Sequence, residues 1–277
     1  MIPAAFEYTK AVTVEDAITQ LSGGDNKLLA GGYSLLPSMK LRLSQPGKLV
    51  DISAIPSLKG IKEENGKIII GAGTTHHDIG INKLIKEHLP FFKDAAAVIG
   101  DVQVRNRGTI GGSLAHADPA ADWPALVLAS GAVIEVLGSG GSRSIKAEDF
   151  FTGFFSTDLQ EGEIITSIKI PIPEKGSKMV YLKYSNPASR FAVVGCAVIR
   201  YPGEKTNIGF TGVADTPFRD SAAEQQVSGK PLNDFTIEEA CKAAAENVNV
   251  NHDLFASSAY RKHLAKVYLK RALKMVM

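Results

Sequence analysis

The sequence predicts an α+β protein with a long N-terminal region and a smaller C-terminal one. In the first region, short apolar runs beside glycine clusters alternate with helical segments, which indicates strands joined by helices. In the second, strand-like runs come first and helices follow, a pattern typical of an antiparallel sheet with helices on one face. Pro171-Ile172-Pro173 and the polar residues behind it separate the regions, so we expect a boundary between 1–172 and 173–277.

The N-terminal region has helix starts and β-branched runs in alternating order. Thr13, followed three residues later by Asp16, is typical of a helix N-cap. Runs rich in Ile and Val predict strands. The expected helices are 14–21, about 35–41, 76–88, 91–100 and 119–129, and the expected strands are 27–30, 48–52, 67–70, 132–137 and 163–170.

The C-terminal region is expected to form a three-stranded sheet followed by three helices. The strands are predicted at 179–185, 192–201 and 207–213, and the helices at about 219–228, 236–249 and 256–276. The last helix carries a run of cations with no acidic residue among them. This run predicts either a solvated face or a surface for an acidic partner. The cations are Arg261, Lys262, Lys266, Lys270, Arg271 and Lys274.

Composition and charge exclude several classes of protein. A chain of 277 residues, 44% of them hydrophobic and 22% charged, can bury an ordinary core. Its 31 Lys and Arg against 29 Asp and Glu leave a net charge of +2, too little to hold nucleic acid. No apolar run approaches the roughly 18–20 residues of a membrane span, and no leader pattern opens the chain. We therefore expect a cytoplasmic protein without a membrane span.

Neither the cysteines nor the histidines form a metal-binding or nucleophilic pattern. Cys196 and Cys241 are too far apart in the sequence for a zinc knuckle and too few for an iron–sulfur cluster, so we expect reduced structural thiols. His76 and His77 are adjacent, and on a helix they are expected to cap it or face solvent. No elbow around a serine nucleophile and no Cys–His pair is present. We expect no metal site and no catalytic residue in this chain.

A first glycine pair lies in Ala30-Gly31-Gly32-Tyr33-Ser34, between an expected strand and an expected helix. Adjacent glycines let the backbone approach a ligand closely. Free N–H groups at a helix N-terminus favour a phosphate. A plain strand–helix turn is the alternative.

A second glycine pair lies in Thr109-Ile110-Gly111-Gly112-Ser113, behind the cations Arg105 and Arg107. Its hydroxyl groups can donate to phosphate oxygens, and its backbone can form an anion nest. Two such loops fit the diphosphate of a dinucleotide, and two separate structural turns are the alternative.

Gly71-Ala72-Gly73 is no Rossmann fingerprint, because His76 stands at the third glycine position and no acidic residue follows at the required distance.

These motifs and their flanks resemble the FAD-binding medium subunit of the molybdenum hydroxylases, of the carbon monoxide dehydrogenase type. They occur in the family's order along essentially the whole chain, and the second glycine motif is the most specific. The matching segments are 30–37, 71–76, 100–113, 116–122, 211–213 and 257–264.

The resemblance implies a two-part FAD-binding region of the PCMH/VAO type, divided at about 1–55 and 56–172, and a C-terminal domain that closes over the flavin. It also implies that the FAD diphosphate lies between the two glycine loops. The cofactor-binding residues that it implies are Leu28, Leu29, Ala30, Gly31, Gly32, Tyr33, Ser34, Leu35, Ile99, Thr109, Ile110, Gly111, Gly112, Ser113, His116, Asp122, Ile165 and Lys183.

The resemblance further implies an electron-transfer subunit of an oxidoreductase complex. FAD would take electrons from the [2Fe-2S] clusters of a small partner and pass them to an external acceptor, while a large partner holds molybdenum and pterin. A dimer of heterotrimers is the expected assembly. One alternative is a self-sufficient flavin-dependent oxidoreductase of the same fold, like the enolpyruvyl-glucosamine reductases, with Ser156, Tyr184 or Arg190 as proton donor. A non-catalytic nucleotide-binding module is the other.

Overall fold

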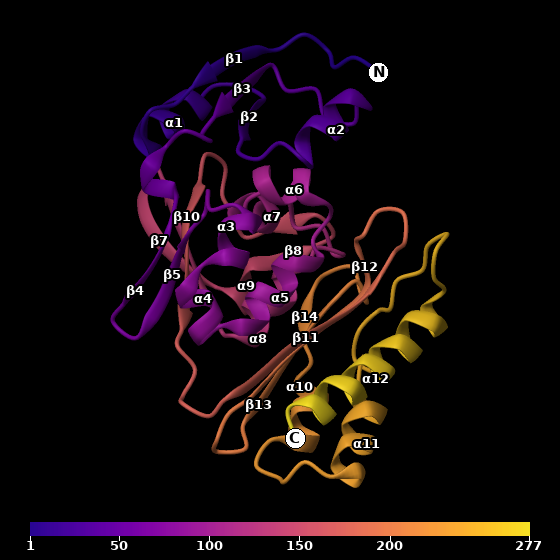
Figure 1. Cartoon of the computed structure of the whole chain (residues 1–277). Coiled ribbons are helices and arrows are strands. Elements are labelled where there is room, and N and C mark those ends of the chain that lie inside the picture. The colour runs from indigo at the N-terminus through magenta and orange to yellow at the C-terminus, as the bar shows by residue number, and fades with distance from the viewer.

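A computed structural model describes every residue from Met1 to Met277. Three sheets follow one another along the chain, and a short hairpin accompanies the second (Figure 1). The structure is thus a mixed helix and strand fold, as the sequence predicts. No helix in it is long and apolar enough to cross a membrane.

The first sheet has three parallel strands in the order β1-β3-β2. Helix α1 begins where the Thr13 side chain accepts a hydrogen bond from the Asp16 N–H, as predicted. The small core beneath this sheet also contains Ile164 of the second sheet, so the two sheets pack on each other. The elements are β1 (Glu7–Lys10), α1 (Val14–Leu21), β2 (Asn26–Leu29), α2 (Leu35–Lys40) and β3 (Lys48–Asp51).

The second sheet has five antiparallel strands in the order β4-β5-β10-β6-β7. Its strands are β4 (Ile61–Glu64), β5 (Lys67–Gly71), β6 (Val133–Gly138), β7 (Gly141–Lys146) and β10 (Ile164–Pro171). The helices that pack with it are α3 (His76–Ile81), α4 (Lys83–His88), α5 (Pro90–Val98), α6 (Val102–Arg107), α7 (Ile110–His116), α8 (Trp123–Ala129) and α9 (Ala147–Phe150), and β8 (Phe151–Gly153) pairs with β9 (Ser156–Thr157).

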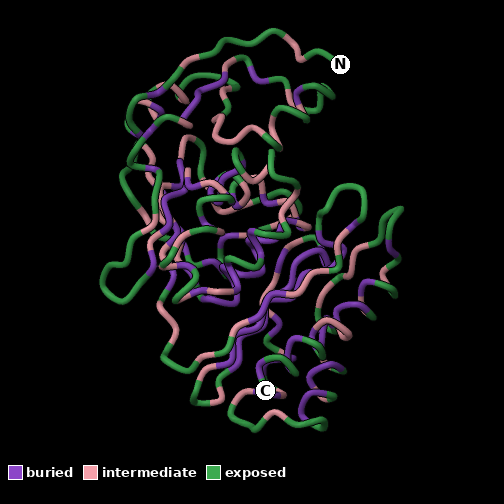
Figure 2. Tube along the Cα trace, in the orientation of Figure 1, coloured by how far each residue is buried: buried purple, intermediate pink, exposed green.

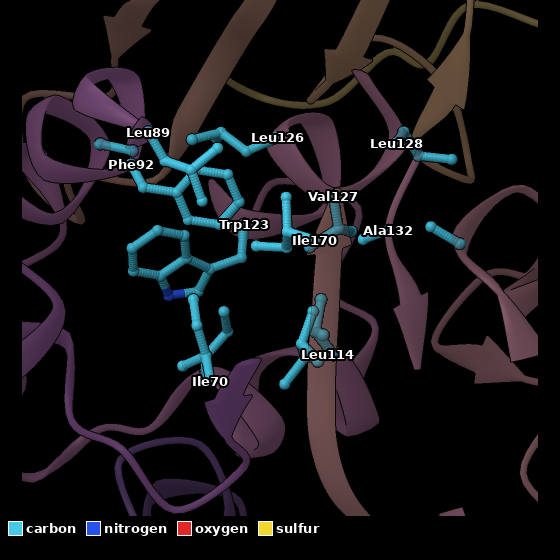
Figure 3. Packing of buried hydrophobic residues seen from close by; sticks show 14 of the residues in the cluster. Ile70, Leu89, Phe92, Leu114, Trp123, Leu126, Val127, Leu128, Ala132 and Ile170 are labelled. Atoms are coloured by element: carbon cyan, nitrogen blue, oxygen red, sulfur yellow. The ribbon is translucent and has the colours of Figure 1, made fainter. Parts of the chain in front are cut away.

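Trp123 and Phe92 belong to the largest core cluster and lie next to each other in it (Figure 3). The Trp123 ring stacks on Phe92 with the centroids 5.5 Å apart, and both side chains are fully buried. Apolar side chains from α5, α7, α8 and the second sheet surround this pair. Because large buried aromatic side chains contribute much of a core's stability, α5 and α8 are held firmly beside the sheet.

The third sheet has four antiparallel strands in the order β11-β12-β13-β14. Helices cover one face, and α5 and α8 of the preceding region lie against the other, so β12 is buried along its whole length (Figure 2). The elements are β11 (Lys178–Ser185), β12 (Ala192–Arg200), β13 (Thr206–Thr211), β14 (Phe218–Arg219), α10 (Ser221–Val227), α11 (Asp234–Ala243) and α12 (Ser258–Met275).

The elements differ from the predictions at a few places, each with a local cause. The helix expected over 76–88 is broken at Asn82, whose side chain accepts hydrogen bonds from the Leu84 and Ile85 N–H groups and starts a new helix. Helices α6 and α7 replace an expected loop, and the Asp101 side chain caps α6. Strands β4 and β7 were missed because both carry mainly polar or charged residues, and the short elements β1, α9, β8 and β9 were missed as well. The two-residue β14 adds a fourth strand to the third sheet.

Candidate cofactor site

A cavity of about 520 Å³ lies where the regions of the three sheets meet. This volume is within the roughly 300–1,000 Å³ that is usual for cofactor pockets. Residues 27–35 form one wall, segments of 99–122 form the second, and the hairpin turn between β11 and β12 contributes the third. The cavity therefore takes its walls from segments that are far apart in the sequence.

The first glycine loop presents a run of unused hydrogen-bond donors to this cavity. None of the six backbone N–H groups of residues 30–35 donates to another atom of the chain. Gly32 has a φ of +80°, which turns the backbone between β2 and α2. A run of free N–H groups in a concave backbone is a favourable site for an anion such as a phosphate.

The two glycine loops are in direct contact. A Cβ atom on Gly31 would lie 2.3 Å from the carbonyl oxygen of Arg107 and 2.7 Å from the Cα of Gly108. The first loop therefore presses its backbone against the segment that leads into the second, near α2, α6 and α7 (Figure 1). Only glycine permits this approach. The structure thus brings together the two motifs that the sequence places about 80 positions apart.

The second loop differs from the expected anion nest. The Gly111 N–H donates to the Ala72 carbonyl at 2.8 Å, and the Gly112 N–H donates to the Thr109 Oγ1 at 3.1 Å. Both groups are already used. The Gly111 N–H is used because α7 packs closely on the segment after β5, where a Cβ on Gly111 would lie 2.5 Å from the Ala72 Cβ, and the Gly112 N–H is used by the N-cap of α7. The glycine pair is visible in the sequence, but its contact with Ala72 is not. Gly112 remains exposed to the cavity, with its missing Cβ 3.9 Å from the Ala30 Cβ.

Asp122, which lines the cavity, belongs to a buried ion pair. The ammonium of Lys183 lies 2.9 Å from the carboxylate of Asp122, and the Tyr181 hydroxyl donates to the same carboxylate at 2.5 Å. Burial raises the pKa of Asp122, although the cation and the hydroxyl stabilise the charged form. Asp122 lines the cavity from the region of the second sheet, whereas both of its partners lie on β11.

The cavity gathers most of the residues that the sequence proposed. Ile110 is an exception because its side chain is fully buried in the core, and Lys183 lies behind Asp122 rather than in the lining. The predicted residues that line the cavity are Leu28, Leu29, Ala30, Gly31, Gly32, Tyr33, Ser34, Leu35, Ile99, Thr109, Gly111, Gly112, Ser113, His116, Asp122 and Ile165.

Several lining residues were not proposed as cofactor contacts. Ser189, Arg190 and Phe191 come from the turn between β11 and β12, and Arg190 has a φ of +62°. Of this turn, the sequence indicated only Arg190, as a candidate proton donor of the alternative oxidoreductase. The other two candidates, Ser156 and Tyr184, do not line the cavity. His76 was expected to cap or to face solvent, and this was wrong: it is 5% exposed and lines the cavity.

Most of the basic run of the last helix is paired with acidic residues of the same chain. Lys262 and Lys266 both bind Glu246, at 2.7 and 2.9 Å. Lys270 pairs with Glu238 and Lys274 with Asp234, while the Arg261 side chain is buried. The sequence could not show these partners, because the acidic residues come from other segments. Arg271 is the exception, because it is exposed and lies over the Tyr268 ring, 5.2 Å from the ring centroid, with no acidic partner in the chain.

The remaining buried polar groups do not form a second reactive site. Burial raises the pKa of the Cys196 thiol well above its ordinary value and that of Cys241 to about 11. Thiols in this state stay protonated and unreactive. The cavity therefore remains the candidate site: its lining combines free amide donors, apolar side chains and the buried carboxylate of Asp122, the mixture of apolar walls and few polar groups that is usual in cofactor pockets.

Comparisons with known proteins agree with a flavin site. A family model described as "FAD binding domain in molybdopterin dehydrogenase" matches residues 4–173, and one described as "CO dehydrogenase flavoprotein C-terminal domain" matches residues 180–276. The glyceraldehyde dehydrogenase medium chain of Sulfolobus acidocaldarius is 39% identical over the full length of both chains. The carbon monoxide dehydrogenase medium chain of Hydrogenophaga pseudoflava is also 39% identical, over 99% of this chain and 97% of the relative.

Solved structures show the same similarity in three dimensions. Carbon monoxide dehydrogenase from Hydrogenophaga pseudoflava superposes with a TM-score of 0.96 at 40% identity, over 100% of this chain and 98% of the matched chain. Quinoline 2-oxidoreductase from Pseudomonas putida 86 gives 0.93 at 31% identity, over 100% and 98%. The chain therefore belongs to the family of FAD-binding medium subunits of the molybdopterin dehydrogenases. It is the FAD-carrying, electron-transferring subunit of an oxidoreductase of the molybdenum hydroxylase type.

Proposed function

We propose that this chain holds FAD in the cavity through the lining residues predicted from the sequence, with the diphosphate at the N–H groups of residues 30–35. The observation that carries the proposal is this run of six unused donors, placed where Gly31 brings the two loops into contact. A run of neutral, unpaired N–H groups stabilises an anion without requiring a buried cation beside it.

The other groups of the site are suited to holding the flavin in position. When bound, FAD supplies a flavin that exchanges electrons singly with iron–sulfur clusters and in pairs with other acceptors. The apolar walls exclude water, and the Asp122–Lys183 pair holds the segment before α8 against β11. No side chain of the cavity pairs a nucleophile with a base, so the chain's own residues bind and orient rather than react.

The electrons are proposed to arrive from [2Fe-2S] clusters of a small partner subunit, in a complex whose large subunit carries molybdenum and pterin. A dimer of such heterotrimers is the proposed assembly, and a cytoplasmic location is part of the same proposal. Two relatives are equally similar, at 39% identity, yet one is named for glyceraldehyde and the other for carbon monoxide. This supports the view that the substrate is selected by a partner subunit.

The proposal also assigns a part of the cofactor site to each region of the chain. Residues 1–55 would supply the first loop, 56–172 the second loop and the core beneath it, and 173–277 a closing domain. The contacts of the third sheet with residues 119–122 support the closing role of residues 173–277. The Thr211 hydroxyl contacts the carbonyl oxygens of Pro119 and Ala121 at 2.7 and 2.6 Å, and the Gly212 N–H donates to Pro119 at 2.6 Å.

The test is a titration of the cofactor-free chain with FAD, in which binding is measured by flavin fluorescence. Stoichiometric binding by the wild type and loss of binding in a first-loop variant, Gly32→Val, are expected. Binding that is unchanged in this variant would contradict the placement. Reduction of the loaded chain by an iron–sulfur partner, with no turnover of small substrates by the chain alone, would separate the relay from a self-sufficient oxidoreductase.

A further inference from the structure

His76 is a buried histidine whose protonation pattern is determined by a neighbour. It is the first residue of α3, and its Nδ1 accepts a hydrogen bond from the indole Nε1–H of Trp123 at 3.0 Å. An indole nitrogen can only donate. Nδ1 must therefore carry a lone pair, and in the neutral imidazole the proton resides on Nε2.

The surroundings keep this imidazole neutral. Burial and the positive charge of Arg105 lower the pKa of His76 to about 4. Protonation of Nδ1 would also break the hydrogen bond from Trp123. At neutral pH, His76 is consequently a fixed, uncharged donor whose one N–H lies on Nε2.

The Nε2 atom has no partner in the chain, and it is not sealed in the core. Among the side-chain hydrogen bonds, only Nδ1 of His76 takes part in one. The fully buried side-chain nitrogen and oxygen atoms without a partner are Ser177 Oγ and Arg261 Nε. His76 Nε2 is not among them, so this atom is not fully buried, and His76 is a residue of the cavity lining.

The position of Nε2 is beside the contact between the two loops. A Cβ on Gly108 would lie 2.6 Å from Nε2, so this glycine makes room for the imidazole. Gly108 is also the residue whose Cα would lie 2.7 Å from a Cβ on Gly31. The free donor of His76 therefore lies close to the loop that carries the unused N–H groups.

We propose that the Nε2–H of His76 donates a hydrogen bond to an oxygen of the cofactor's diphosphate, and that Trp123 is a positioning residue that fixes the required tautomer. The inference rests on the proposed placement of FAD. Its physical advantage is that a neutral donor adds to the N–H groups of the first loop without the cost of burying a cation.

The test compares three chains in their cofactor-free form: wild type, His76→Phe and His76→Gln. Phe fills the space without a donor, whereas the amide of Gln retains one. FAD binding is measured by flavin fluorescence. Binding of ADP, which has the diphosphate but no flavin, is measured by its competition with FAD. His76→Phe is expected to weaken both ligands at least tenfold, which corresponds to about 1.4 kcal/mol. His76→Gln is expected to remain within about threefold of the wild type.

Each other outcome contradicts a defined part of the inference. Unchanged FAD binding in His76→Phe, with binding lost in Gly32→Val, would remove the role of His76 and leave the placement of FAD intact. Unchanged binding in both variants would remove the placement as well. Weaker FAD binding with unchanged ADP binding would show that His76 donates to the flavin part of FAD, which would overturn the assignment to the diphosphate.

A spectroscopic measurement tests the positioning role of Trp123 and does not depend on activity. Nitrogen NMR of the imidazole should show the Nε2–H tautomer alone in the cofactor-free chain, and the Nε2 signal should shift when FAD is added. Trp123→Phe, which preserves an aromatic side chain but removes the donor, should produce a mixture of tautomers. A single unchanged tautomer in Trp123→Phe would show that Trp123 does not fix it. Thermal unfolding of each variant reports whether the fold is retained.

Discussion

The ammonium of Lys183 lies 2.9 Å from the carboxylate of Asp122, although the two residues are 61 positions apart. The same ammonium donates to the Val98 carbonyl at 3.1 Å, beside Ile99 of the cavity lining. One side chain of β11 therefore braces two segments of the cavity wall. Lys183 and Asp122 are only 3% and 5% exposed, so the strength of their interaction is not reduced by solvent as a surface pair would be.

Replacing Lys183 by Met should destabilise the chain and weaken FAD binding. The substitution leaves Asp122 buried without its cation, a change that typically costs about 3–5 kcal/mol. Thermal unfolding and FAD titration measure the effect. Lys175→Met, at an exposed lysine, is the control, and adding Asp122→Asn to Lys183→Met should recover part of the stability. A melting temperature equal to that of the wild type would show that the pair contributes nothing.

Gly31→Ala should separate the two loops. Its Cβ would lie 2.3 Å from the Arg107 carbonyl oxygen, closer than real Cβ atoms come to backbone, so one loop must move. We expect FAD to be lost from the purified chain. Gly140→Ala is the matched control, because no atom lies within 4 Å of the added methyl group. Normal flavin content in Gly31→Ala would mean that the contact between the loops is not needed.

Gly112→Val should exclude FAD, and it should also shift the Thr109 side chain, whose Oγ1 caps α7 through the Gly112 N–H. Gly112 is exposed to the cavity, and an added Cβ would meet only Thr109 Oγ1 at 2.9 Å and the Ala30 Cβ at 3.9 Å. The larger side chain would thus occupy the space between the loops rather than the core. The ratio of flavin absorbance to protein absorbance in the purified variant measures the outcome. Gly112→Ala should retain more flavin than Gly112→Val, and the reverse order would contradict the steric argument.

Thr211→Val should loosen the segment that precedes Asp122. The variant keeps the shape of the side chain but leaves the Ala121 carbonyl oxygen without its hydroxyl donor, whereas the Pro119 carbonyl retains the Gly212 N–H. A buried unsatisfied group typically costs about 1–3 kcal/mol, and the free energy of unfolding should fall by this amount. Thr211→Ser, which retains the hydroxyl, should lie closer to the wild type. Equal losses in both variants would assign the effect to packing.

The pH dependence of stability should contain a contribution from His76. Its pKa is about 4 in the folded chain and about 6.5 when unfolded, so the unfolded chain binds a proton first as the pH falls. The stabilisation is complete above about pH 6.5 and is lost between there and about pH 4, by up to about 3 kcal/mol. In His76→Gln, denaturant unfolding should show a flatter profile in this window. An identical slope in both chains would contradict the buried, neutral state.

The local motifs could be recognised from the sequence because each needs only neighbouring residues. The glycine pair at 31–32 follows an apolar strand, and Thr13 with Asp16 predicts a cap that the structure contains. The same local reasoning failed where the partner lies elsewhere. The N–H group of Gly111 looks free in the sequence but donates to Ala72, and the lysines of the last helix look unpaired until Glu246 is placed beside them.

The amino-acid sequence alone determined the order of the elements, the two glycine loops and the family resemblance, because periodicity and motif spacing are properties of adjacent residues. Only the tertiary structure decided which donors are unused, which charges are paired and which residues form the third wall of the cavity. These properties depend on contacts such as Gly31 with Arg107 and Asp122 with Lys183, which exist only after the three sheets have packed together. The packing of distant segments therefore determines which atoms of the predicted motifs remain available to a cofactor.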